Sequence, residues 1–420
     1  MPMRFERVVI VLIVIVAVAA AFVWFGRGRT GPATELDRPT AATEPDRPTA
    51  AAGEAALLVV GVEGFEMDIV ERLVAEGRLP RVGRLLDDGA LQTFANLGKT
   101  TDRGVAWTSV ATGMTPENHG LGVPRTTERG AEVETEPTPS NRTAETLWTI
   151  ANSNGHRVCV VGWPATWPAE VVDGLMMAPY EQYVLERAHG GDHASGVHPP
   201  EQLAAVDALV RAPGSVERRD LLRFVDLDSR LGPEALVGQN YQSLAEAYAG
   251  DRSCIDVALH GLTDVGSDVV CVYLEGLNTV SQRFWHYMDP EPFERIEARP
   301  EDEEFFEGQI EALGGTIDRY YEYVDMLLGE LVDACGDDVT VAVVADHGYI
   351  GIEFDARGGP KIGQHMHSEE GVWIASGPRV AGDVTVPDGS ITDFAPTVLA
   401  AAGIETAVDF DGEAQERALR

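Results

Sequence analysis

The chain contains short, uninterrupted runs of apolar and β-branched residues, bounded by turn-forming residues and separated by stretches of helical periodicity. The strand-like runs lie at 57–62, 156–163, 268–276 and 339–348. The helical stretches lie at 146–153, 251–262 and 317–335. Short strands that are apolar on both faces are typical of a mainly parallel sheet with helices on each side. The sequence therefore predicts an α/β fold in which helices sandwich such a sheet.

Polar side chains follow three of these runs. Glu63 comes after the first run, Asn278 and Gln282 come after the third, and the pair Asp346–His347 lies near the end of the fourth. In open α/β sheets, ligands bind at the carboxyl ends of the strands. We therefore expect these side chains to converge on one functional site.

The tripeptide Asp346–His347–Gly348 has two interpretations from the residues alone. A metal-dependent phosphoryl transferase needs carboxylates and imidazoles around one or two divalent cations, with a hydroxyl nucleophile beside them. Asp346 and His347 are suitable ligands, and His367 would complete a set. The same tripeptide also occurs in ordinary Asx-capped turns, so both interpretations stay open at this point.

The N-terminal region contains an apolar run, Val8–Phe25, of 18 residues. Such a run is long enough to cross a hydrocarbon core as a helix. Arginines flank it on both sides, so flanking charge does not decide its orientation. A cleaved signal peptide is the alternative, with small residues at 17–21 offering a cleavage site. We expect residues 1–25 to be a retained single-pass membrane anchor, with the globular domain outside the cytoplasm.

The remaining chain divides into a tether and one large domain. Residues 26–56 are rich in Pro, Ala, Thr and charge and contain the sequence DRPTAA twice, which predicts a disordered linker. We expect a single domain over 57–420. Two segments, 199–250 and 289–309, interrupt the alternation of strands and helices, and we interpret them as insertions that cap the sheet edge.

The charge balance excludes one class of partner. Asp and Glu number 68 against 32 Lys and Arg, for a formal net charge of −36. An acidic surface repels phosphate backbones at long range, so we expect no nucleic-acid partner. The four cysteines show no CxxC spacing, and we expect buried structural residues rather than a zinc site or a disulfide framework.

Nine stretches of the chain share the order and spacing of a known family's motifs. They are VVGVEG (59–64), VAWTSVATGMTPENHG (105–120), LWTIANSNGHRVCVVGWPATWP (147–168), VDGLMMAP (172–179), GVHPP (196–200), VYLEGLNTVSQRFWHYMDP (272–290), VAVVADHGY (341–349), HSEEGVWIASGP (367–378) and DFAPTVLAAAGI (393–404). Through them the chain resembles the type I phosphodiesterase/nucleotide pyrophosphatase-like branch of the alkaline phosphatase superfamily. The resemblance implies an alkaline-phosphatase-like fold and two-metal phosphoester hydrolysis through a Ser or Thr intermediate.

The residues at the matched site positions depart from the family pattern. Glu63 stands where the family has Asp, and Arg103 stands at the position of the Ser or Thr nucleophile. Asn278 and Gln282 stand where the family has Asp and His. The residues that match the family's metal ligands outright are Asp346, His347 and His367.

These substitutions have a common physical consequence. Amide oxygens are poor replacements for a carboxylate and an imidazole at a zinc site. Arg103 is always protonated, cannot act as a nucleophile, and brings a cation into the space of a metal. We therefore predict that Arg103 pairs with Glu63 and Asp346 and that the site is metal-free.

Three hypotheses about function follow. In the first, the chain is a membrane-anchored pseudoenzyme with a scaffolding or anion-binding role and no cofactor. In the second, it is a divergent phosphodiesterase or phosphatase that uses zinc or manganese, with Thr101 as an alternative nucleophile. In the third, the pocket binds a phosphate ester or another anionic small molecule through Arg103 without turnover.

Overall fold

A computed structural model describes residues 56–97, 102–126, 132–290, 300–349 and 370–420. The segment containing the predicted anchor and linker lies outside these residues, as do Thr101 and His367. Among the described helices, none is both long and apolar enough to cross a membrane. The account below concerns the unit formed by residues 50–420.

Within the described residues, the centre of this unit is a nine-stranded sheet in the order β11-β2-β10-β9-β1-β8-β5-β6-β7. The strands of this sheet are β1 (Leu57–Val62), β2 (Ala90–Ala95), β5 (Val158–Val161), β6 (Gly174–Met177), β7 (Val197–His198), β8 (Val269–Leu274), β9 (Thr340–Ala345), β10 (Glu370–Ser376) and β11 (Val384–Ser390). The five central strands from β9 to β6 run parallel, whereas β10 is antiparallel to both β9 and β2, and β7 is antiparallel to β6. A separate hairpin pairs β3 (Pro124–Thr126) with β4 (Glu132–Glu134).

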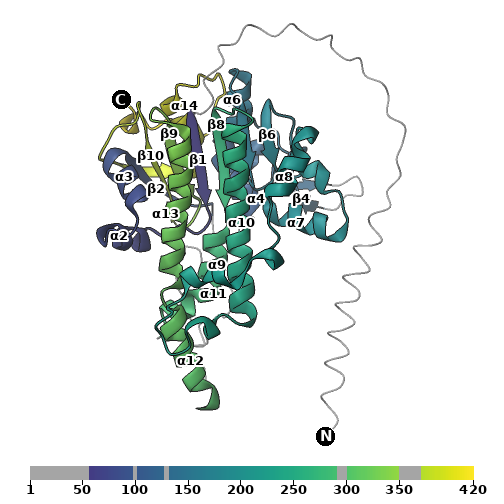
Figure 1. Ribbon diagram of the computed structural model, residues 1–420. Coiled ribbons are helices and arrows are strands. Elements are labelled where there is room, and N and C mark those ends of the chain that lie inside the picture. The colour runs from purple at the N-terminus through teal and green to yellow at the C-terminus, as the bar shows by residue number, and fades with distance from the viewer. Residues whose placement is uncertain (1–55, 98–101, 127–131, 291–299, 350–369) are drawn as a thin grey trace. The chain divides into compact units, whose positions relative to one another are not determined.

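Helices cover both faces of the sheet, with α10 and α13 running side by side along one of them (Figure 1). The helices are α2 (Met67–Ala75), α3 (Pro80–Asp88), α4 (Arg103–Thr112), α5 (Pro116–His119), α6 (Leu147–Ser153), α7 (Tyr180–His189), α8 (Leu203–Leu209), α9 (Arg218–Leu221), α10 (Gly238–Thr263), α11 (Gly276–Met288), α12 (Pro300–Leu313), α13 (Thr316–Cys335) and α14 (Phe394–Ala402). The prediction of an α/β fold with a large, mainly parallel sheet between helices is confirmed.

The apolar runs bury both of their faces because successive side chains of a strand point to opposite sides. In β1, Leu58 and Val60 pack into the core under α10, α11 and α13, whereas Leu57 and Val59 pack into the second core with α4, α6 and α14. The four cysteines are free and buried, as expected from their apolar surroundings.

Two helices differ from the sequence prediction. The helix expected at 251–262 begins at Gly238, because Leu244, Ala245 and Ala247 continue its buried face toward the N-terminus. The end of the predicted 199–250 insertion is therefore part of α10, and a capping role for the rest stays a prediction. The acidic segment expected as an insertion at 289–309 overlaps α12, which packs against α11.

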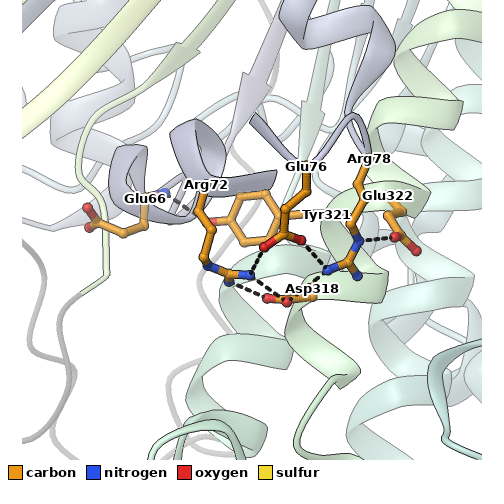
Figure 2. Close-up of polar contacts among 7 residues, drawn as sticks. All are labelled: Glu66, Arg72, Glu76, Arg78, Asp318, Tyr321 and Glu322. Carbon is orange, nitrogen blue, oxygen red and sulfur yellow. Dashed lines mark hydrogen bonds and ion pairs between the residues drawn. The ribbon is translucent and has the colours of Figure 1, made fainter. Parts of the chain in front are cut away.

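A network of charges fixes α2 to α13 (Figure 2). Asp318 of α13 accepts hydrogen bonds from Arg72 at 2.9 and 2.7 Å and from Arg78 at 3.3 Å. Arg78 also donates to Glu322 at 2.6 Å and to Glu76 at 3.0 Å. These contacts hold the helix that follows β1, and so help to fix the chain just beyond Glu63.

Candidate metal centre and the Arg103 pocket

The register of the parallel strands brings three acidic residues to one edge of the sheet. Val62 of β1 lies opposite Leu274 of β8, and Gly61 lies opposite Val344 of β9. The first residues after the ends of β1, β8 and β9 are Glu63, Glu275 and Asp346, which therefore lie side by side. The backbone amide of Glu63 continues the ladder by donating to the carbonyl of Leu274 at 3.0 Å.

Glu63 is buried and receives hydrogen bonds at both carboxylate oxygens. Its Oε2 accepts from Nε1 of Trp107 at 2.7 Å and from the hydroxyl of Tyr273, and its Oε1 lies 3.0 Å from Nε2 of His347. The Trp107 ring also meets Trp163 and Tyr273 edge to face, with centroids 5.3 and 4.8 Å apart. Burial opposes ionisation of Glu63, but the hydrogen bond and charge of His347 lower its pKa overall, so the carboxylate is ionised.

Asp346 and His347 share the same buried space. Burial raises the pKa of Asp346 to about 7, and the negative charge of Glu63 acts in the same direction. Burial would lower the pKa of His347, but the charge of Asp346 and the hydrogen bond to Glu63 raise it to about 9. At neutral pH, His347 is therefore a cation beside Glu63, and its Nε2 lies 3.7 Å from Oδ1 of Asp346.

The donor set at this point fits one divalent cation, which counts against the prediction of a metal-free site. Glu63, Asp346 and His347 each offer a ligand atom, and the three atoms lie within 4.8 Å of one another. Oδ1 of Asp346 is buried and accepts no hydrogen bond from the described residues. Three protein ligands with an open position are typical of catalytic zinc sites. A bound ion would displace the proton of His347, because only neutral imidazole ligates.

The other two substituted positions lie on α11. Asn278 is buried, and its Oδ1 lacks a hydrogen-bond partner among the described residues. This atom lies near the residue after Glu63, because a Cβ built on Gly64 would be 3.7 Å from it. Gln282, one turn further along α11, is exposed. The structure thus brings Asn278 to the group of Glu63 but leaves Gln282 at the surface.

Arg103 is the first residue of α4, and its partners differ from the prediction. Its Nη1 pairs with Oε1 of Glu275, and its Nη2 lies 3.1 Å from Oε2 of Glu181. Its direct partners are therefore Glu275 and Glu181 rather than the predicted Glu63 and Asp346. The charge of the guanidinium nevertheless acts to lower the pKa of both predicted partners. Burial would lower the pKa of Arg103, but the surrounding acidic groups raise it, so it stays charged.

The neighbouring pocket is small and strongly acidic. Arg103 lines it together with Tyr180, Glu181, Glu246, Asp251 and Glu275. Asp251 is buried and accepts hydrogen bonds from the backbone amide of Gly276 at 2.9 Å and from the hydroxyl of Tyr320 at 2.8 Å. Burial nevertheless raises the pKa of Asp251 to about 7.

Sequence reasoning missed the partners of the site residues. Glu275 was detectable, because it directly follows a buried strand as Glu63 does. Trp107 lies within a motif-matching stretch, but nothing in its sequence context distinguishes a hydrogen-bonded indole from a packed one. Glu181 lies in the first turn of α7, far along the chain, and only tertiary structure brings it to Arg103.

A Ser–His pair formed by α4 and α5 has the geometry of a packing contact. Nε2 of His119 lies 3.0 Å from the hydroxyl oxygen of Ser109, and Nδ1 accepts from the amide of Leu121 at 3.2 Å. Burial lowers the pKa of His119 to about 4, so the neutral ring carries its proton on Nε2 and donates it to Ser109. His119 therefore does not activate Ser109 as a nucleophile.

Fold and site together define an α/β protein with a metal-competent, acidic centre at the carboxyl edge of a mainly parallel sheet. A sequence model described as type I phosphodiesterase/nucleotide pyrophosphatase matches residues 57–409, and the chain belongs to this family. The resemblance drawn from the motifs is thereby confirmed. A comparison with curated proteins yields no match.

Solved structures that match this chain share little sequence with it. An inactive variant of murine ectonucleotide pyrophosphatase/phosphodiesterase 5 in complex with AMP is 13% identical, with a TM-score of 0.50, over 87% of this chain and 100% of that one. The human protein of that name is 12% identical, with a TM-score of 0.47, over 87% and 99%. Phosphonoacetate hydrolase from Sinorhizobium meliloti is 16% identical, with a TM-score of 0.43, over 74% and 60%. At such identities, the likeness concerns the fold alone.

Proposed function

We propose that this chain is a membrane-anchored, catalytically degenerate member of its family that binds a phosphate ester without hydrolysing it. The observation that supports this most is the place of Arg103. The family resemblance puts the nucleophilic hydroxyl at this residue, and the structure shows a guanidinium tied to Glu275 and Glu181 there. A guanidinium cannot form the covalent intermediate that a Ser or Thr hydroxyl forms.

The surroundings of Glu63 support the same proposal. The hydrogen bonds to its carboxylate come from Trp107, Tyr273 and His347, so within the described residues no Ser or Thr hydroxyl contacts it.

The contacts of Arg103 also bear on how an ester would bind. Both terminal nitrogens of the guanidinium already face carboxylates, which disfavours the hypothesis that Arg103 itself holds the anion.

A phosphate monoester such as AMP is the ligand class we propose. The murine neighbour is seen with AMP, and the Glu63–Asp346–His347 group offers a position for a cation that would attract a phosphate. A divalent ion bound there would polarise phosphoryl oxygens as a Lewis acid. Without a nucleophile beside it, this polarisation favours binding but does not start a displacement.

The test uses the full chain in detergent with manganese or zinc. We expect AMP to raise the melting temperature and bind in calorimetry, with nitrophenyl phosphate and bis(nitrophenyl) phosphate left intact. Asp346→Ala should lose AMP binding, whereas Asp173→Ala, which removes an exposed carboxylate, should keep it. Metal-dependent release of nitrophenol that Asp346→Ala abolishes would contradict the proposal.

The divergent hydrolase remains the second candidate, because Glu63, Asp346 and His347 still form one compact ligand group. In that case Thr101 would supply the hydroxyl. Turnover lost in both Thr101→Ala and Asp346→Ala, but kept in Thr100→Ala, would establish this candidate in place of the first.

The anchor and the location of the domain are part of the proposal and rest on the apolar run Val8–Phe25. We expect the full chain to stay in the membrane pellet after a carbonate wash. Deleting residues 1–25 should release it, and protease added outside intact cells should cut the full-length protein. Recovery of the full chain in the carbonate supernatant would overturn the anchor.

A further inference from the structure

Arg103 is held on two sides by carboxylates from different parts of the fold. Glu275 is the N-cap residue of α11, and Glu181 lies in the first turn of α7. With one terminal nitrogen on each carboxylate, the guanidinium joins α4, α7 and α11. These two contacts hold its charge at the junction of the three helices, with the pair to Glu181 open to solvent.

The pocket around Arg103 brings four carboxyl groups close to this one cation. Glu181, Glu246, Glu275 and Asp251 all line it. Burial raises the pKa of Glu275 to about 8, against the opposing effect of Arg103, and the charge of Glu181 raises it further. Without Arg103, these carboxylates would repel one another and lack a counter-charge.

Tyr273 separates this pocket from the Glu63 group and contacts both. Its hydroxyl donates to Glu63, and its side chain lines the pocket of Arg103. On the Glu63 side, Oδ1 of Asp346 and Oδ1 of Asn278 are at least nine-tenths buried and accept no hydrogen bond from the described residues. Buried acceptor oxygens need a partner, and a cation held by Glu63, Asp346 and His347 would supply one to Asp346.

Among the described residues, the ligand atoms on the Glu63 side gather around one position. Trp107 and Tyr273 already occupy Oε2 of Glu63, which leaves a single oxygen of this residue for a metal. A second ion of the family's kind would need the carboxylate and imidazole that Asn278 and Gln282 replace, and Gln282 is exposed.

We infer that Glu275 and Glu181 position Arg103 as a built-in cation in place of one divalent ion, so that the site takes a single ion instead of two. This inference deepens the proposed function and rests on it for the identity of the site. One ion without a hydroxyl nucleophile suits the binding of an ester. A fixed guanidinium beside the ion supplies the remaining positive charge without offering an open coordination position.

Ion stoichiometry tests the inference without any ester. The full chain in detergent is stripped with a chelator, titrated with Mn²⁺ in a calorimeter, and analysed for bound metal. We expect one ion on the wild-type chain and one on Arg103→Lys, which keeps the charge. Arg103→Thr should bind two ions, because Glu275 and Glu181 become free to ligate. The melting temperature of Arg103→Thr should fall when a chelator is added and recover when Mn²⁺ is added.

Three further variants make the result specific. Arg157→Ala removes another arginine whose charged partner is the exposed Asp173, and should keep one ion without any recovery by metal. The double variant Arg103→Thr/Glu275→Gln should return to one ion. Arg103→Met keeps the aliphatic stem and answers the same question if the threonine variant fails to fold.

The inference is overturned if the wild-type chain binds no ion or two, or if both uncharged variants at position 103 stay at one. Its failure is distinct from that of the proposed function. A wild-type chain that binds one ion and hydrolyses AMP would contradict the proposed function and leave the ion count intact.

Discussion

The indole nitrogen of Trp107 donates a hydrogen bond of 2.7 Å to Oε2 of Glu63, joining α4 to the end of β1 beneath the candidate metal centre. Both side chains are buried, and a hydrogen bond to a buried charge contributes more than one between neutral groups. The contact therefore links the stability of the fold to the geometry of the site.

Trp107→Phe is expected to lower the free energy of unfolding by about 2 kcal/mol more than Trp148→Phe does. Trp148 is equally buried, but its Nε1 has no hydrogen-bond partner among the described residues, so it controls for lost ring volume. Urea denaturation of both variants measures the difference. Equal losses would show that the bond to Glu63 adds nothing to stability.

Gly61→Ala is expected to destabilise the protein by about 1–3 kcal/mol. A Cβ at this buried position would lie 2.5 Å from Cζ3 of Trp107, so the indole must move away from Glu63. Gly214→Ala is the matched control, because nothing lies within 4 Å of its added Cβ. Denaturation curves that coincide for the two variants would contradict the close approach of Trp107 to β1.

Asp251 makes stability depend on pH. Its pKa is about 7 in the folded protein against 3.8 ordinarily, so folding favours the protonated form. The stabilisation is fully present below the ordinary value and is lost as pH rises through about 7, by up to about 4 kcal/mol. Asp251→Asn should match the wild type near pH 4 and exceed it in unfolding free energy at pH 8.

The difference between the two proteins isolates Asp251 from the other groups that titrate in this range. Denaturation at several pH values between 4 and 8 provides the measurement. The asparagine Oδ1 keeps the acceptor for the amide of Gly276, and its NH2 group can donate to the hydroxyl oxygen of Tyr320, so its fold should be intact. If the difference in unfolding free energy between the two proteins does not grow with pH, ionisation of Asp251 does not destabilise the fold.

Asp318→Asn is expected to lower stability by only about 1 kcal/mol, although Asp318 contacts both Arg72 and Arg78 (Figure 2). The arginines are about a third or more exposed, so water and salt screen the network. The loss should shrink in high salt. Asp173→Asn, which breaks a single exposed pair with Arg157, should have a smaller effect.

The strands of the sheet's centre and the edge that carries the site were predictable because their signals are local. Buried strands such as β1 and β9 are unbroken apolar runs, and Glu63 and Asp346 directly follow them. Strand β2, the neighbour of the edge strand β11, alternates buried with partly or fully exposed residues and therefore lacks an unbroken apolar run. The early start of α10 was missed because Gly238, Asn240 and Gly250 are poor helix formers and interrupt its helical pattern.

The identity of the partners was not predictable. Matching to the family placed Arg103 at the nucleophile position, but charge alone suggested Glu63 and Asp346 as its counter-ions. Which carboxylate a guanidinium reaches depends on the direction of its helix and on side chains that already satisfy the competing acids. Both are properties of the tertiary structure.

The edge-to-face contacts of Trp107 with Trp163 and Tyr273 have an optical consequence. An indole whose N–H is bound to a carboxylate senses any change in that carboxylate's charge, and neighbouring rings couple to its electronic transitions. Binding of an ion at the candidate metal centre should therefore alter the near-ultraviolet circular dichroism and the tryptophan emission. This change needs no label, and it should be absent in Trp107→Phe.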